Sequence, residues 1–134
     1  MTAGEKMLTL QRELFADDCE MDTYMERYNN RNRELREEGL KTGTWDTVTA
    51  QAKKLGEDRR REWARHEKFQ EEGYGELQQL RAETSPDELT PEQLSEIVQL
   101  AEASLAMSQR RLKEAQKEKE QAVRWLDGGP PPTL

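Results

Sequence analysis

The sequence predicts an all-α protein, an elongated antiparallel three-helix bundle or coiled coil that runs up, down and up. The strongest observation is a repeat near the C-terminus, where apolar and small residues recur at alternating steps of four and three. This is the 3.5-residue period of a coiled-coil seam. The seam consists of Leu94, Val98, Ala101, Leu105, Ser108, Leu112, Ala115, Lys119, Ala122 and Leu126.

Composition supports the same fold class. Hydrophobic residues make up 33% of the 134 residues and charged residues 37%, whereas globular domains average about 45–50% and 25%. The mean hydropathy is -1.14. This is too polar for a rounded core, but long helices need only a narrow apolar stripe each. We therefore expect slender helices rather than a compact globule.

The first helix is expected from about residue 5 to 38. A row of large side chains recurs every seven residues in this stretch and would face the core. Its members are Met7, Leu14, Met21, Tyr28 and Leu35. Gly39 is a suitable residue just past a helix end, so residues 39–43 are expected to form a loop.

The second helix is expected from about residue 45 to 81. Thr44 can cap it, Trp45 is its first residue, and Asp46 suits the positive end of the helix dipole. Each glycine inside a helix costs about 1 kcal/mol relative to alanine. Any kink or break is therefore expected at Gly73–Gly75.

The third helix is expected over residues 91–126, after a short helical turn at 86–89. Ser85 and Pro86 form a cap followed by a proline at the first helical position, and Thr90 and Pro91 repeat that pattern. Residues 1–129 are expected to form one coiled-coil domain and residues 130–134 a proline-rich tail. The pattern also leaves open a domain-swapped or oligomeric version of the same bundle.

Charge predicts how the first two helices align. Residues 13–26 carry six acids and no base, whereas residues 57–70 carry five Lys or Arg and four acids. Short loops make neighbouring helices antiparallel, and this places Asp17 level with His66 and Tyr24 level with Arg59. We expect Asp17, His66 and Arg59 to set the register, and Asp17 to contact His66, as polar seam residues do.

Catalytic, metal and cofactor chemistry are not expected. The chain has one His and one Cys, far apart in sequence, and zinc sites require closely spaced ligands. No phosphate-binding glycine loop is present. The net charge of -7 disfavours direct binding to nucleic acid, and no apolar run is long enough to span a membrane. One cysteine and no signal-peptide pattern suggest an intracellular, cytoplasmic protein, with a nuclear or virion location as alternatives.

The expected function is that of a non-catalytic structural or adaptor protein, a helical spacer that binds other proteins by coiled-coil packing within a large assembly, including viral, phage or cytoskeletal ones. The expected contacts are the apolar Trp63, Tyr74 and Met107 and the acidic tip Asp87, Glu88 and Glu92. Alternatives are an acidic inhibitor that imitates nucleic acid on a basic protein surface, and an acidic-tipped hairpin that regulates a large enzyme.

Overall fold

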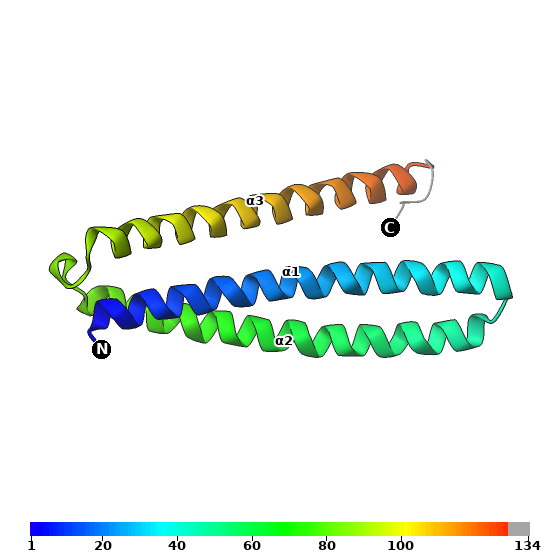
Figure 1. The fold of residues 1–134 in the computed structure, drawn as a ribbon. Helices are drawn as coiled ribbons and strands as arrows, with labels where there is room; N and C mark the ends of the chain where they lie inside the picture. The colour runs from blue at the N-terminus through cyan, green and yellow to red at the C-terminus, as the bar shows by residue number, and fades with distance from the viewer. Residues whose placement is uncertain (129–134) are drawn as a thin grey trace. The chain divides into compact units, whose positions relative to one another are not determined.

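The computed structural model describes residues 1–128, and that part of the chain is all-α with three long helices and no strand. The helices are α1 (Ala3–Thr42), α2 (Trp45–Glu83) and α3 (Pro91–Leu126), and a short 3-10 turn, η1 (Pro86–Glu88), precedes α3. Figure 1 shows α1 and α2 side by side in opposite directions. The predicted tail, residues 130–134, lies outside the described residues.

The core of the hairpin follows the predicted seven-residue row of the first helix. Four of the five members of that row are buried: Met7, Leu14, Met21 and Leu35. From α2 and the connection after it come Val48, Leu77, Leu80 and Leu89. The most enclosed side chains, Met21, Leu35 and Leu77, are only 1% exposed. One narrow stripe per helix therefore suffices to hold α1 against α2.

The prediction that the first helix ends before Gly39 was wrong. Helix α1 continues to Thr42, and the residue in the left-handed conformation is Gly43, with a φ of 68°. The Gly43 amide donates to the Gly39 carbonyl at 2.9 Å. Gly39 is buried beneath the ring of Trp45, where a Cβ atom would lie 2.5 Å from the ring. This glycine therefore permits close helix packing rather than a turn.

The second helix is continuous over Trp45–Glu83, so it has no break at Gly73–Gly75. Gly73 is buried against the side chain of Leu14, which occupies the space where a Cβ atom would lie. Thr44 precedes the helix as predicted, but its side chain makes no capping hydrogen bond. Its hydroxyl lies 2.6 Å from that of Thr42 instead.

The turn η1 closes the open end of the hairpin. The Glu88 carboxylate accepts from the Ser85 amide and, with its other oxygen, from the Gly4 amide, both at 3.4 Å. Leu89 packs against Gly4. Free amides at a helix N-terminus attract negative charge. Glu88, predicted as part of an acidic partner-binding tip, therefore caps α1 within the same chain.

Glu88→Ala should therefore lower the free energy of unfolding of the hairpin, whereas Asp87→Ala should not. The loss expected for Glu88 is about 0.5–2 kcal/mol, the range for removing a helix cap. Asp87 is exposed, and exposed substitutions usually stay within about 0.5 kcal/mol. Urea unfolding followed by circular dichroism measures both. An equal loss for the two variants would contradict the capping role.

The structure divides into two compact units, residues 1–90 and a second unit that begins at Pro91. The predicted single domain over residues 1–129 and the packing of the third helix on the hairpin therefore stay predictions. Helix α3 has the predicted bounds, and Gly128, with a φ of 88°, follows it. None of its residues is buried, and its seam leucines and Val98 are exposed.

Candidate functional site

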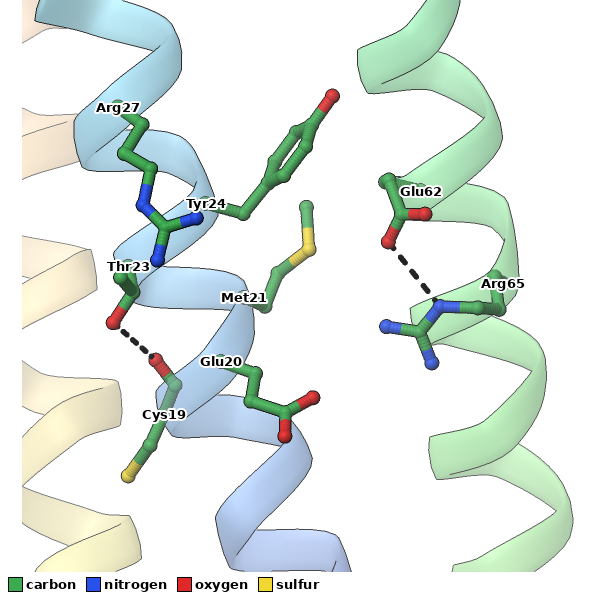
Figure 2. Close-up of a pocket in the computed structure, with 8 residues that line it drawn as sticks. All are labelled: Cys19, Glu20, Met21, Thr23, Tyr24, Arg27, Glu62 and Arg65. Carbon is green, nitrogen blue, oxygen red and sulfur yellow. Dashed lines mark hydrogen bonds and ion pairs between the residues drawn. The ribbon is translucent and has the colours of Figure 1, made fainter.

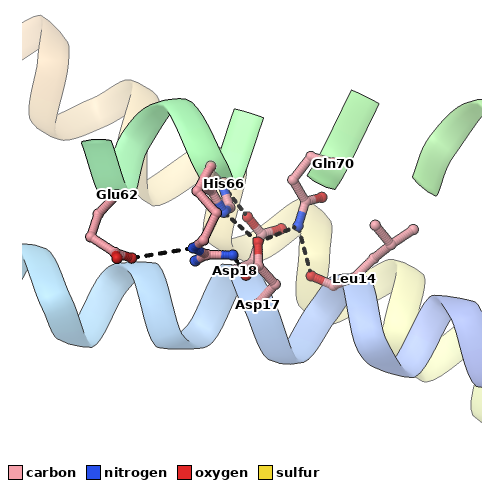
Figure 3. Close-up of polar contacts among 7 residues, drawn as sticks. Leu14, Asp17, Asp18, Glu62, His66 and Gln70 are labelled. Carbon is pink, nitrogen blue, oxygen red and sulfur yellow. Dashed lines mark hydrogen bonds and ion pairs between the residues drawn. The ribbon is translucent and has the colours of Figure 1, made fainter. Parts of the chain in front are cut away.

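Two of the three buried polar or charged side chains among the described residues are the predicted pair Asp17 and His66. His66 Nδ1 lies 2.6 Å from one Asp17 carboxylate oxygen, and His66 Nε2 lies 3.3 Å from an Asp18 oxygen. Both members of the pair are buried. Figure 3 shows the two aspartates of α1 and His66 of α2 pointing toward one another. The predicted contact is confirmed, although the second carboxylate on the ring was not expected.

Two further side chains of α2, Arg65 and Gln70, bind the same aspartate. We call the whole group the His66 cluster, and its members are Asp17, Asp18, Arg65, His66 and Gln70. Arg65 donates to the other carboxylate oxygen of Asp17, Oδ1, at 3.0 Å. The Gln70 amide donates to Asp17 at 3.2 Å and to the Leu14 carbonyl at 3.0 Å. Burial alone would raise the pKa of Asp17, but the hydrogen bonds from Gln70, Arg65 and His66 outweigh it and hold the pKa below 3.8. The carboxylate is thus held in its charged form.

Acid should weaken the hairpin through Asp17. Because its folded-state pKa lies below the ordinary value of 3.8, the unfolded chain takes up this proton first as the pH falls. The stabilisation is complete above the unfolded pKa and disappears as the pH passes through the folded pKa. Urea unfolding between about pH 6 and pH 2.5 should show a shallower decline for Asp17→Asn than for the wild type. Identical profiles would contradict this.

An open groove of about 530 Å³ lies beside the cluster and is lined by residues of α1 and α2. Its lining residues are Cys19, Glu20, Met21, Thr23, Tyr24, Arg27, Glu62 and Arg65. In Figure 2 the Tyr24 ring points toward α2, whereas the Cys19 sulfur points away from it. Burial, together with the carboxylates of Asp58 and Glu62, raises the pKa of Tyr24. His66 is not among the lining residues, so the groove does not bring its imidazole together with the Cys19 thiol.

Arg59, predicted to lie level with Tyr24, contacts the next tyrosine of α1. Its guanidinium lies over the ring of Tyr28, 5.0 Å from the ring centroid, which is a cation–π contact. Arg59 thus joins the two helices through an aromatic face, and its predicted role in setting the register stays a prediction.

A second groove, of about 390 Å³, lies over Trp63 and is lined by Met25, Arg59, Arg60, Trp63, Ala64 and Glu67. Trp63 remains 40% exposed, and its indole N–H donates to Glu67 at 2.8 Å. Its ring also lies 5.6 Å from the His66 ring, centroid to centroid. An apolar side chain beside two arginines suits contact with another protein, because Trp and Arg are enriched where protein interfaces are strongest.

The remaining predicted contact residues lie on α2, in η1 and on α3. Tyr74 is exposed on α2, and Asp87 and Glu92 are exposed at and just after η1. Met107 is half-buried on α3 rather than exposed. Trp63 contacts the His66 cluster through the ring contact. A shared role of these residues in partner binding stays a prediction.

Comparisons with family models, with curated proteins and with solved structures gave no match. Within residues 1–128, no three or more His, Cys, Asp and Glu side chains are grouped so that they could hold a metal ion. In the same range, no helix combines the length and the apolar character that crossing a bilayer requires.

We expect the His66 cluster to align the helices. Its carboxylates, guanidinium and amide bind one another, and Asp17 is held ionised. Another register of α1 on α2 would leave the buried carboxylate without these donors, which is costly.

The apolar row predicted as the seam of the third helix is exposed on α3. Its exposed members are Leu94, Val98, Leu105, Leu112 and Leu126.

Proposed function

We propose that the protein is a non-catalytic structural or adaptor protein, a helical spacer that binds other proteins through helix packing inside a larger assembly. The observation that carries this proposal is the exposed apolar row of α3. Val98, Leu105 and Leu112 are each more than half exposed. Amphipathic helices of this kind bind by laying their apolar face against another helix or into a groove.

The hairpin supports a mechanical role. Its two helices have 40 and 39 residues, and at 1.5 Å per residue each is roughly 60 Å long. The buried Asp17–His66 pair fixes how they align. A long hairpin with a fixed register can hold two bound molecules a set distance apart. Trp63 and Tyr74, exposed along α2, are positioned to contact a bound protein.

The alternative of an acidic inhibitor that imitates nucleic acid receives less support. Such an inhibitor must present its carboxylates to a partner, but Asp17 and Asp18 contact His66, and Asp17 also contacts Arg65. The regulatory acidic tip is weakened in the same way, because Glu88 accepts from the Gly4 amide. In both acidic stretches, carboxylates contribute to the fold.

Co-purification from the cells that make the protein tests the proposal. Apolar packing survives high salt, whereas contacts between exposed charges are screened at about 1 M salt. We expect bound proteins to be retained at that salt and to be lost from the double variant Leu105→Asp/Leu112→Asp. The control, Gln99→Asp/Ala106→Asp, adds the same charges with the same spacing on another face of α3. The opposite result would overturn the proposal in favour of an acidic inhibitor: bound proteins are lost at high salt, and Leu105→Asp/Leu112→Asp binds them as well as the wild type does.

A further inference from the structure

Helix α3 carries two interleaved rows along one exposed face. The first row is large, with Val98, Leu105 and Leu112 separated by seven residues and Lys119 at the next position. The second row is small and falls between them, at Ala101, Ser108, Ala115 and Ala122. Every residue of both rows is exposed. A face with large side chains on one side and small ones on the other fits a surface in which the two rows are exchanged.

Charge along α3 divides at its middle. Residues 91–109 carry three acids, Glu92, Glu96 and Glu102, and no base. Residues 110–126 carry six bases and three acids. One half of the helix is therefore net negative and the other net positive. A helix that runs in the opposite direction and has the same sequence would complement this division along its whole length.

We propose that α3 is the interface of a homodimer, in which it pairs with α3 of a second copy in the antiparallel direction. This inference rests on the proposed function, since it names what covers the same exposed row. A two-fold axis across the helix pair places the large row of each copy opposite the small row of the other. It also lays each acidic half along a basic half.

One alignment pairs all ten seam positions. It sets Leu112 against Ser108 of the second copy, Leu105 against its Ala115 and Val98 against its Ala122. Each of these layers combines a large with a small side chain, so the layers have similar total volume, as tight packing requires. The remaining layers set Lys119 against Ala101 and Leu94 against Leu126. The small alanine leaves room for the lysine stem to reach solvent.

A parallel pair would be worse in both packing and charge. It would alternate layers of two leucines with layers of two alanines or serines, which leaves gaps along the seam. It would also set Lys119 against Lys119 and bring the two basic halves together, and like charges at an interface are unfavourable. Direction is thus determined mainly by Lys119 and the unequal rows.

The antiparallel pair separates the two hairpins. Each hairpin joins α3 at Thr90, and the two copies of that junction lie at opposite ends of the helix pair. A 36-residue helix is roughly 54 Å long, so the junctions are about that far apart. The result is a symmetric pair with one hairpin, and one exposed Trp63, joined at each of the two separated junctions.

The mass of the purified 134-residue chain in solution is the first test. Light scattering after size exclusion should give twice the chain mass of 15.6 kDa. Leu105→Asp/Leu112→Asp should give the single-chain mass, and Gln99→Asp/Ala106→Asp should remain dimeric. Circular dichroism of each variant checks that the hairpin is still helical. A wild-type protein that is monomeric at 100-fold dilution and at the highest soluble concentration would overturn the proposal.

Cysteine pairing then tests the direction, in a Cys19→Ser background. A mixture of Val98→Cys and Ala122→Cys chains should form a mixed disulfide under mild oxidation, because the two positions face each other across the antiparallel pair. Val98→Cys alone should not link to itself, and if it does, the helices are parallel and the proposed direction is wrong. Loss of the mixed disulfide on adding Leu105→Asp/Leu112→Asp to both chains is the expected control result.

The two proposals fail in different ways. If the purified chain is monomeric but other proteins stay bound to it at high salt, the homodimer proposal is wrong and the adaptor function is supported. A purified dimer that retains no other protein in its native cells overturns the adaptor function and leaves the antiparallel pair standing.

Discussion

His66→Leu should lower the free energy of unfolding of the hairpin by about 1.5–3 kcal/mol, the range for losing a hydrogen bond to a charged group, since Arg65 and Gln70 still donate to that group. The reason is the carboxylate of Asp17, which is buried and 2.6 Å from the ring that the substitution removes. Small domains have total stabilities of about 5–15 kcal/mol. Urea unfolding followed by circular dichroism at 222 nm measures the loss.

The partner variants make this prediction specific to the pair. Asp17→Leu should also destabilise the hairpin, because it leaves His66 and Arg65 without their shared acceptor. The double variant Asp17→Leu/His66→Leu should recover most of either loss, since replacing a buried pair by apolar residues is often neutral or stabilising. Arg65, whose side chain is about half exposed, can turn to water. Additive losses in the double variant would show that the pair does not act as a unit.

An exposed ion pair of the same hairpin supplies the control. Arg31 and Glu34 lie on α1 with 3.2 Å between their charged atoms, and both side chains are largely exposed. Pairs of this kind contribute about 0–1 kcal/mol. Glu34→Leu should therefore change the free energy of unfolding far less than His66→Leu, although it also removes one half of an ion pair.

Leu35→Ala should cost about 2–5 kcal/mol, the range for truncating a fully buried leucine. Leu35 is 1% exposed, whereas Leu40, five residues farther along the same helix, is 72% exposed. Leu40→Ala should stay within about 0.5 kcal/mol. Urea midpoints of the two variants, measured side by side, provide the comparison. Similar losses at both positions would mean that the apolar stripe of α1 faces a different direction.

The Leu35→Ala prediction also tests which interactions hold α1 and α2 together. The hairpin has a narrow core, so each buried side chain accounts for a large share of the apolar surface removed from water. Val48 is the other buried apolar residue at this end of the hairpin. A large loss at Leu35 would show that this end depends on the core stripe rather than on the exposed charges around it.

The bounds of α3 show what local sequence signals can determine. Pro91 begins the helix and Gly128 follows its end, as expected, because proline and glycine act on the backbone of their immediate neighbours. The Asp17–His66 contact was also predictable. It required only helix lengths, a short loop and the rule that a buried charge needs a partner.

The features that local signals could not give depend on residues that are distant in the sequence. Gly39 was predicted at a helix end, and the ring of Trp45 above it shows that this glycine permits close packing inside α1. Glu88 was predicted at a binding tip, and its contact with the Gly4 amide gives the same carboxylate a role in the fold. The contact of Arg59 with the ring of Tyr28 was not predicted from the sequence.

By itself, the sequence determined that this protein is helical, where its second and third helices begin, and which stripe of α1 is buried. These features depend on periodicity and on capping, which act over a few residues. Only the tertiary structure decided which glycines permit close packing and which acid caps α1, because both depend on contacts between residues far apart in the sequence. A seam specifies an apolar face but not its occupant, because any helix with matching side chains can cover it.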